Sequence, residues 1–338
     1  MRLTDSKTTL VAVLFVMAGM PKADAQPPSV ILQIDFENNV QYNQDISDVS
    51  KLATDPGVTT AAPSRNFVSN AVIADVVAVN GHPAKGIFFR ERRLISLTPT
   101  PGPGQAVADV ARNFSGFQTA FEILQVDGTP VGSIFLSGFG GGSPPPPGAP
   151  LIQNLSNLAI VGGTGAFLGA RGQGGEATFV GASGARQASM SEDPANRRNK
   201  GGGKQRWVLH LIPLFWPQIL VTASGPAVYH ADFSPVTMAK PAVSGEVLIV
   251  KATGLGPTRP GIDPGQPFPL DVAQEVNSPV DVTVNGQAAA VINRIGWPGL
   301  VDTYRIDFRV PDGMAVGTAA IQLTAGWIPG VSVNIPTY

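Results

Sequence analysis

The chain has 338 residues, of which 39 are glycine, 31 are proline and none is cysteine, and its formal net charge is −1. Glycine and proline make up about a fifth of the chain, against about 12% on average, and both interrupt helix interiors, which excludes a helical bundle or coiled coil. The lack of cysteine excludes disulfides and thiolate chemistry, and the near-neutral charge gives no basis for binding nucleic acid or an anionic membrane.

The N-terminus carries the three parts of a secretory signal. Arg2 and Lys7 accompany an apolar run, Thr9–Met20, and Ala23-Asp24-Ala25 supplies the small residues that signal peptidase requires. The run is too short to cross a bilayer as a helix. We therefore expect residues 1–25 to be a signal peptide cleaved near Ala25, and the mature chain to be exported without a membrane span. The alternative is a buried N-terminal strand or helix of a cytosolic protein.

Residues 30–214 contain about eight strand candidates with turn signals between them and no amphipathic helix. The first candidate, Val30–Glu37, alternates apolar and polar side chains, the period of a half-buried strand. Asn80-Gly81 and Asp127-Gly128 are tight-turn dipeptides that predict hairpins. Short strands joined by turns favour a barrel or a sandwich. The remaining candidates are Ala71–Val79, Gly86–Leu97, Phe117–Val126, Val131–Phe139, Leu155–Val161, Gly174–Gly181 and Gln205–Leu214.

Two segments of this region predict loops. Residues 139–150 are rich in glycine and proline and indicate a projecting loop with polyproline character. Residues 186–206 collect six basic side chains against Glu192 and Asp193. An anion or nucleic-acid site is one interpretation of this charge. A solvated hairpin loop is favoured, because no aromatic residue interleaves the charges.

From about Pro241 the pattern changes to evenly spaced short strands. Six or seven strands in about 100 residues predict an immunoglobulin-like sandwich at residues 236–338. Residues 218–235 are the expected transition from a first domain at residues 26–217. The predicted strands are Glu246–Ala252, Val280–Asn285, Ala289–Ile295, Tyr304–Val310, Ala319–Ala325 and Val331–Ile335.

Four ordered motifs of the second domain carry a resemblance to a known family. They are Ser244–Leu248, Gly254–Thr258, Val282–Gly286 and Tyr304–Pro311. Together they resemble the C-terminal Ig-like domain of IPT/TIG type that recurs in secreted acidobacterial proteins, over about Val228–Tyr338. The resemblance implies a module for display, docking or spacing without catalytic residues, and a cell-surface or extracellular protein as its partner.

The segment Leu158–Gly172 (LAIVGGTGAFLGARG) resembles the allene oxide cyclase and dirigent barrel family. That family carries an apolar strand, a GGTG turn, an aromatic residue and then Ala-Arg-Gly. The resemblance implies an eight-stranded antiparallel barrel with an apolar cavity, whose plant members guide cyclisation or radical coupling without a metal. It also implies cavity positions for Arg171, which matches the motif arginine, and for Asp35, which corresponds to an acid of the first strand.

Other patterns of chemistry are weak or missing. The glycines of residues 163–169 follow an apolar strand, but they lack the spacing, the helix and the acid of a dinucleotide site. The three histidines lack metal-ligand spacing, and no Gly-x-Ser-x-Gly elbow exists. Asp35 and Glu37 share a strand face and could form a carboxylate pair, although exposed acids on a wet strand face are commoner.

The expected fold is therefore all-β, an eight-stranded antiparallel barrel followed by an Ig-like β-sandwich, with no cofactor. The preferred function is a secreted, non-enzymatic binding or structural protein whose barrel holds a small apolar ligand or serves as a scaffold. The alternative is a dirigent- or cyclase-like protein that uses Asp35 and Arg171, and it requires both side chains to face one cavity. Polysaccharide binding, a third class, requires an exposed aromatic platform, and the chain has four Trp and four Tyr.

Overall fold

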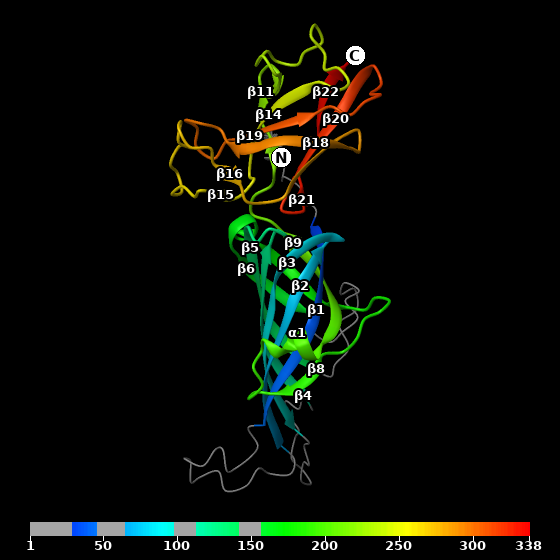
Figure 1. Cartoon of the computed structure of the whole chain (residues 1–338), viewed down its shortest axis with the longest axis vertical. Coiled ribbons are helices and arrows are strands. Elements are labelled where there is room, and N and C mark those ends of the chain that lie inside the picture. Colours follow the sequence, from blue (N-terminus) through cyan, green and yellow to red (C-terminus); the bar gives the residue numbers. More distant parts are fainter. Residues whose placement is uncertain (1–28, 46–64, 98–112, 142–156) are drawn as a thin grey trace, which may run out of the picture.

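The structure, a computed structural model, describes residues 29–45, 65–97, 113–141 and 157–338. The signal peptide expected at residues 1–25 and most of the loop expected at residues 139–150 lie outside these residues. The described chain is all-β apart from two very short helices, which confirms the predicted class. A barrel and a second β region follow one another along the long axis of the molecule (Figure 1). The barrel end next to the second region is called the upper end below.

Eight antiparallel strands close the barrel, as the turn pattern predicted. They follow one another around it in the order β1-β2-β3-β4-β5-β6-β7-β9, and β1 pairs with both β2 and β9. The strands are β1 (Val30–Asp45), β2 (Arg65–Val79), β3 (His82–Leu97), β4 (Asn113–Leu124), β5 (Pro130–Gly141), β6 (Leu158–Gly163), β7 (Arg171–Ala177) and β9 (Gly203–Ile212).

Both predicted hairpins are present in the barrel. Asn80 and Gly81 connect β2 to β3 with φ values of 49° and 78°, the two positive values that a type I′ turn needs. The Asn80 Oδ1 atom also accepts a hydrogen bond of 2.7 Å from the Gln33 backbone N–H. The second hairpin has a longer connection, in which the Gln125 N–H donates to the Thr129 carbonyl at 2.8 Å.

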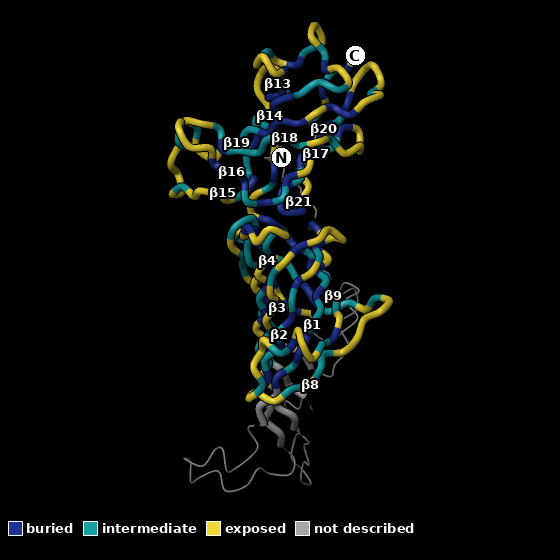
Figure 2. The backbone as a smooth tube through the Cα atoms, viewed as in Figure 1, coloured by how far each residue is buried: buried dark blue, intermediate teal, exposed yellow. Residues whose placement is uncertain are grey.

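Aromatic side chains fill the middle of the barrel interior. Phe36 stacks on Phe88 with 4.5 Å between ring centroids, and the rings of Phe121 and Trp207 lie 5.1 and 5.5 Å from that of Phe88. The exposed fraction of all four side chains is 1% or less. Figure 2 shows buried positions along the barrel strands in dark blue. The surrounding aliphatic core residues include Leu32, Ile34, Ile134, Leu136, Leu158 and Leu209.

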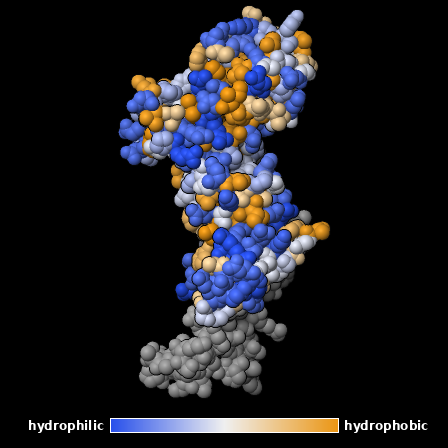
Figure 3. All heavy atoms as spheres, in the orientation of Figure 1, coloured by the Kyte–Doolittle hydropathy of each residue, from blue (hydrophilic) through white to orange (hydrophobic). Residues whose placement is uncertain are grey.

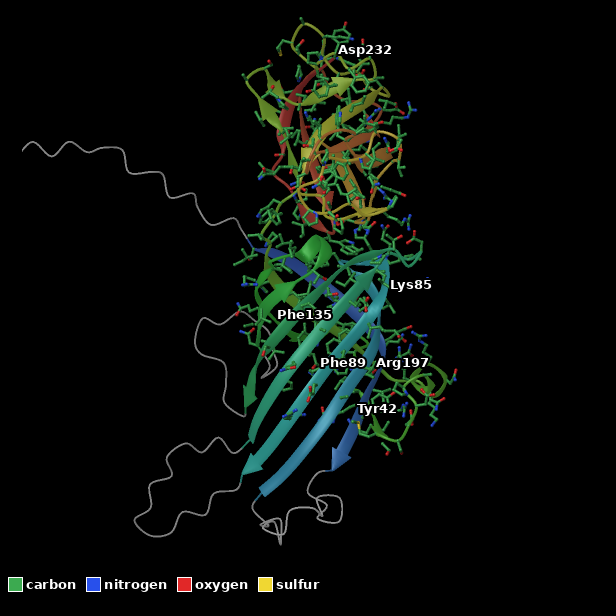
Figure 4. The ribbon with its side chains drawn as sticks, turned by 90° about the vertical axis from the view of Figure 1, so that its left-hand side faces the viewer. Tyr42, Lys85, Phe89, Phe135, Arg197 and Asp232 are labelled. Atoms are coloured by element: carbon green, nitrogen blue, oxygen red, sulfur yellow. The ribbon has the colours of Figure 1, made fainter. Side chains whose placement is uncertain are left out.

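Residues 186–200 form a folded flap on the outer face of β1 and β2, and not the solvated hairpin loop that the charge pattern predicted. The flap consists of β8 (Arg186–Ser189) and the short helix α1 (Asn196–Lys200). β8 pairs in parallel with the end of β1, beyond the part of β1 that pairs with β9. Asp75 of β2 binds Arg197 at 2.6 Å and Arg198 at 2.8 Å. Figure 4 labels Arg197 on this side of the barrel. Much of the basic charge is therefore paired within the protein.

The second β region is an eleven-stranded sheet that curls around its own core. All six strands predicted from the sequence are present. They are β14 (Val247–Thr253), β17 (Val280–Val284), β18 (Gln287–Gly296), β19 (Tyr304–Arg309), β20 (Gly317–Ala325) and β22 (Val333–Thr337). β18 forms the corner of the sheet, because its first part pairs with β17 and its later part with β19. The immunoglobulin-like assignment of this sheet stays a prediction.

Short strands complete the second region. β10 (Gln218–Ile219) and β13 (Val228–His230) both pair with β14, so the segment expected to be a transition contributes to the sheet. β15 (Thr258–Arg259) pairs with β16 (Glu275–Val276), and β21 (Ile328–Pro329) pairs with β20. The strands β11 (Val221–Thr222) and β12 (Gly225–Pro226) form a separate pair.

The second β region closes the upper end of the barrel. Trp327, in the turn after β20, and Ile328, the first residue of β21, are 8% and 2% exposed and belong to the hydrophobic core of the barrel. Trp327 has a φ of 62°, a strained value for a bulky residue, and burial of its indole offsets this cost. The Arg259 side chain donates a hydrogen bond of 2.8 Å to Thr129 Oγ1 across the same junction. Trp327 and Ile328 therefore tie the second region to the core of the barrel, while the rest of the second region packs around a core of its own.

Candidate functional site

Asp35 lies on the outer face of the barrel, outside its interior. Its neighbours on β1, Ile34 and Phe36, point inward with exposed fractions of 0% and 1%, so the alternation of the strand directs Asp35 outward. Both of its carboxylate oxygens accept hydrogen bonds from Arg206, at 2.5 and 2.8 Å. The Arg206 guanidinium lies 4.9 Å from the ring centroid of Phe179. Asp35 is thus half of a bidentate surface ion pair.

Arg171 also lies on the outer face, and the structure does not bring it to Asp35. Its guanidinium donates to the carbonyls of Val161 and Ala170 at 2.8 and 2.9 Å, which fixes the turn between β6 and β7. On β9, Arg206 is the partner of Asp35 and Ile212 is the partner of Arg171. These two positions of β9 are six residues apart, or roughly 20 Å at the usual rise per strand residue, and so are Asp35 and Arg171 along the strand direction. The common cavity that the cyclase-like alternative requires is not formed by these two side chains.

The GGTG motif has a structural role at the upper end of the barrel. It leads into a single helical turn, η1 (Gly165–Phe167), whose Phe167 is 1% exposed in the barrel core. A Cβ atom on Gly163 would lie 2.3 Å from the Phe167 carbonyl oxygen, and one on Gly165 would lie 2.3 Å from that of Val131. Only glycine allows this close approach of backbone segments.

A different set of side chains faces the interior in the lower half of the barrel. Arg90 and Arg92 follow Phe88 on the inner face of β3, because inward residues alternate along a strand. Glu176 of β7 is paired in register with the inward-facing Trp207, and Gln205 of β9 with the inward-facing Phe36. Strands β1, β2 and β4 add Asn39, Asn70 and Thr119, which are 0%, 2% and 3% exposed. We call these seven residues, Asn39, Asn70, Arg90, Arg92, Thr119, Glu176 and Gln205, the lumen cluster.

Arg90 is the deepest cation of the lumen cluster. Its guanidinium lies 5.9 Å from the ring centroid of Phe88 and 5.5 Å from that of Phe117, cation-π contacts that partly replace lost hydration. Burial lowers the pKa of Arg90 to about 10. Its Nε atom is buried without a hydrogen-bond partner, and its guanidinium forms no ion pair within 4.0 Å among the described residues. The residue is only partly buried, and the alternation of β3 directs its side chain into the barrel.

Glu176 faces Arg90 from the other side of the barrel. β3 and β7 are four strands apart in either direction around the closed order, so they form opposite walls. Gln205 donates a hydrogen bond of 2.7 Å to Glu176 Oε1, and Asn39 donates to Gln205 Oε1. Burial raises the pKa of Glu176, and the charge of Arg90 partly opposes this rise. The two charges therefore act on each other across the lumen without direct contact.

Several polar atoms of the lumen cluster are buried without a partner. They are Asn39 Oδ1, Asn70 Oδ1, Arg90 Nε and Thr119 Oγ1. Most buried polar atoms in proteins are hydrogen-bonded, since each unpaired one costs free energy. This concentration of unpaired buried polar atoms beside two arginines marks the lumen cluster as the candidate site.

Other features of the described chain are weaker candidates for a functional site. Phe89 and Phe135, 42% and 41% exposed, lie in one cross-strand row with Ala120 on the outer face (Figure 4). This row is the closest feature to an aromatic platform for polysaccharide, but phenylalanine lacks the polar edge of Trp or Tyr. Within the described ranges, no group of three metal-ligating side chains could hold an ion, and no helix is long and apolar enough to span a bilayer.

The sequence reasoning missed the lumen cluster. Its signal lies in the strand 86–97, where Phe88, Arg90 and Arg92 alternate with Phe89, Glu91 and Arg93. Each face carries both aromatic and charged residues, so the pattern does not tell which face is the inner one. Comparison with known proteins adds no further signal, because no family model, curated protein or solved structure matches the chain.

Proposed function

We propose that this protein is a non-enzymatic binding protein whose barrel takes a small molecule with an anionic group in its lower half. The observation that carries the proposal is Arg90, a deep guanidinium that faces the barrel interior and has no ion-pair partner among the described residues. An unpaired cation pays a desolvation penalty of several kcal/mol. A carboxylate, sulfate or phosphate group on the ligand would offset this penalty through charge-assisted hydrogen bonds.

The lower half of the barrel suits this ligand better than the apolar molecule that the family resemblance implied. The aromatic column around Phe88 and Trp207 occupies the middle of the interior with the protein's own side chains. Arg92 adds a second positive charge near the site and lies 5.7 Å from the Phe117 ring centroid. Figure 3 shows an orange, hydrophobic patch in the middle of the visible outer face of the barrel and hydrophilic residues below it.

Binding is proposed rather than catalysis because the lumen cluster offers charge and hydrogen bonds without an activated nucleophile. Thr119 Oγ1 has no hydrogen-bond partner, whereas a catalytic hydroxyl needs an adjacent base. The outward positions of Asp35 and Arg171 support the same choice. The proposal places this binding outside the cytoplasm, after cleavage near Ala25, on the strength of the N-terminal sequence pattern.

Isothermal titration calorimetry tests the proposal with sodium butyrate, benzoate and phosphate as probes. We expect the wild-type protein to bind at least one of these anions, and Arg90→Gln to weaken that binding at least tenfold. Arg171→Gln is the matched control, since Arg171 is an arginine on the outer face, and it should bind like the wild type. Absence of binding to every probe, or equal binding by Arg90→Gln, would overturn the proposal.

A further inference from the structure

The lumen cluster is divided between two unlike walls of the barrel. Both of its cations, Arg90 and Arg92, come from β3. Its acid, Glu176, comes from β7 on the opposite wall, and the neighbouring strands β9 and β1 contribute Gln205 and Asn39. The interior is therefore positive on one side and negative on the other.

The hydrogen-bond chain on the negative wall has a defined direction. The Asn39 amide donates to Gln205, and the Gln205 amide donates to Glu176 Oε1. Each link uses an N–H group of one side chain and a carbonyl or carboxylate oxygen of the next. The chain leaves Asn39 Oδ1, on a fully buried residue, without a partner. This wall therefore presents one unpaired acceptor, Asn39 Oδ1, beside the negative charge of Glu176.

A simple anion would satisfy only one of the two walls. Placed at Arg90, it would still feel the like charge of Glu176 in a site of low dielectric, where repulsion is stronger than in water. A molecule with a donor or cationic group at its other end would convert this repulsion into attraction. Arg90 does not itself neutralise Glu176, since no ion pair within 4.0 Å joins them among the described residues.

We infer that the ligand is dipolar, an amino carboxylate whose carboxylate binds the Arg90 wall and whose ammonium group binds Glu176 and Asn39. This inference rests on the proposed function and names the chemical class of the ligand. It follows from the placement of one acid and two arginines on facing strands, with one unpaired buried acceptor, Asn39 Oδ1, on a residue that is bonded into the acidic side.

Matched pairs of probes test the inference by calorimetry. The amino carboxylates glycine, 4-aminobutyrate and 6-aminohexanoate are compared with acetate, butyrate and hexanoate, which have the same lengths and lack the amine. We expect at least one amino carboxylate to bind the wild type at least tenfold more tightly than its partner. In Glu176→Gln this preference should vanish while binding of the simple carboxylate stays or improves.

The control variant is Glu37→Gln, because Glu37 lies on the outer side of β1 and is paired with Lys204 at 3.6 Å. It should keep the preference of the wild type. If Glu176→Gln does not fold, the inference can still be tested on the wild type by NMR. There, 4-aminobutyrate, and not butyrate, should shift the side-chain carboxyl ¹³C resonance of Glu176. Equal affinity for both members of every pair, or a preference that survives in Glu176→Gln, would overturn the dipolar ligand alone. Failure of all six probes to bind would overturn the dipolar ligand, and failure of benzoate and phosphate as well would remove the proposed function with it.

Discussion

Arg90 on β3 and Glu176 on β7 face each other from opposite walls of the barrel, and each charge alters the pKa of the other without forming an ion pair. A buried pair at this separation does not repay the desolvation of its members. The arrangement therefore lowers the stability of the empty barrel and prepares it for a charged ligand, a trade between stability and function that is common in binding sites.

Glu176→Gln should change how stability depends on pH. Burial raises the pKa of Glu176 above its ordinary value, so the folded state holds this proton more tightly than the unfolded state does. The wild type should therefore lose stability as the pH rises through the unfolded value of about 4.3 toward the raised folded value. Urea unfolding between pH 4 and 7 should show a smaller decline for Glu176→Gln. An equal or steeper decline in the variant would contradict this assignment.

Asp75→Asn should release the flap. The stability that Asp75 contributes is lost as the pH falls, whereas the stability that Glu176 contributes is lost as the pH rises. Two arginines of α1 hold the pKa of Asp75 at about 2, below its unfolded value. Its contribution is present above about pH 4 and is lost as the pH falls toward 2, and it amounts to about 2 kcal/mol. Chemical unfolding at pH 6 should show this loss in Asp75→Asn. Asp281→Asn, on an exposed position of β17, is the control, and an equal effect of both would refute the pairing.

Trp327→Ala should uncouple the second β region from the barrel. Loss of a buried indole costs about 3–5 kcal/mol in a typical core, and this one lies in the core of the barrel although it belongs to the second region. We expect two separate unfolding transitions in calorimetry where the wild type shows one. Trp297→Ala removes a partly exposed indole of the second region and should keep a single transition.

Gly163→Ala should block folding of the barrel or cost more than about 3 kcal/mol, because the new Cβ would meet two backbone carbonyls. Gly184→Ala is the control, since a Cβ there has no neighbour within 4 Å. Thermal unfolding followed by circular dichroism compares the two variants. A Gly163→Ala protein as stable as the wild type would show that the GGTG turn is not needed for close packing.

Much of the fold follows from local signals in the sequence. The turn dipeptide Asn80-Gly81 and the alternation in Val30–Glu37 each act over a few residues, so they predict strands and hairpins without knowledge of the rest. The evenly spaced strands of the second region are predicted by local signals of the same kind. The number of barrel strands follows because each predicted turn joins neighbours in the sheet.

The candidate site could not be predicted in the same way, because it depends on contacts between distant segments. Arg90 and Glu176 are on strands that are separated by most of the barrel sequence, and their relation appears only when β9 pairs with β1. Asp35 was a candidate through the family resemblance and through its shared strand face with Glu37, but Arg206 pairs with it on the outer face. The flap depends on Asp75, whose partners Arg197 and Arg198 lie far along the chain.

The most direct test of the account is side-chain NMR of the wild-type protein during titration with 4-aminobutyrate and butyrate. The Nε–H group of Arg90 is buried without a partner, so a bound carboxylate should shift its resonance in a saturable manner. The resonance of Arg171, whose guanidinium binds two backbone carbonyls on the outer face, should not move. A resonance of Arg90 that stays in place with both probes, or that moves only as Arg171 does, would contradict a binding site in the lower half of the barrel.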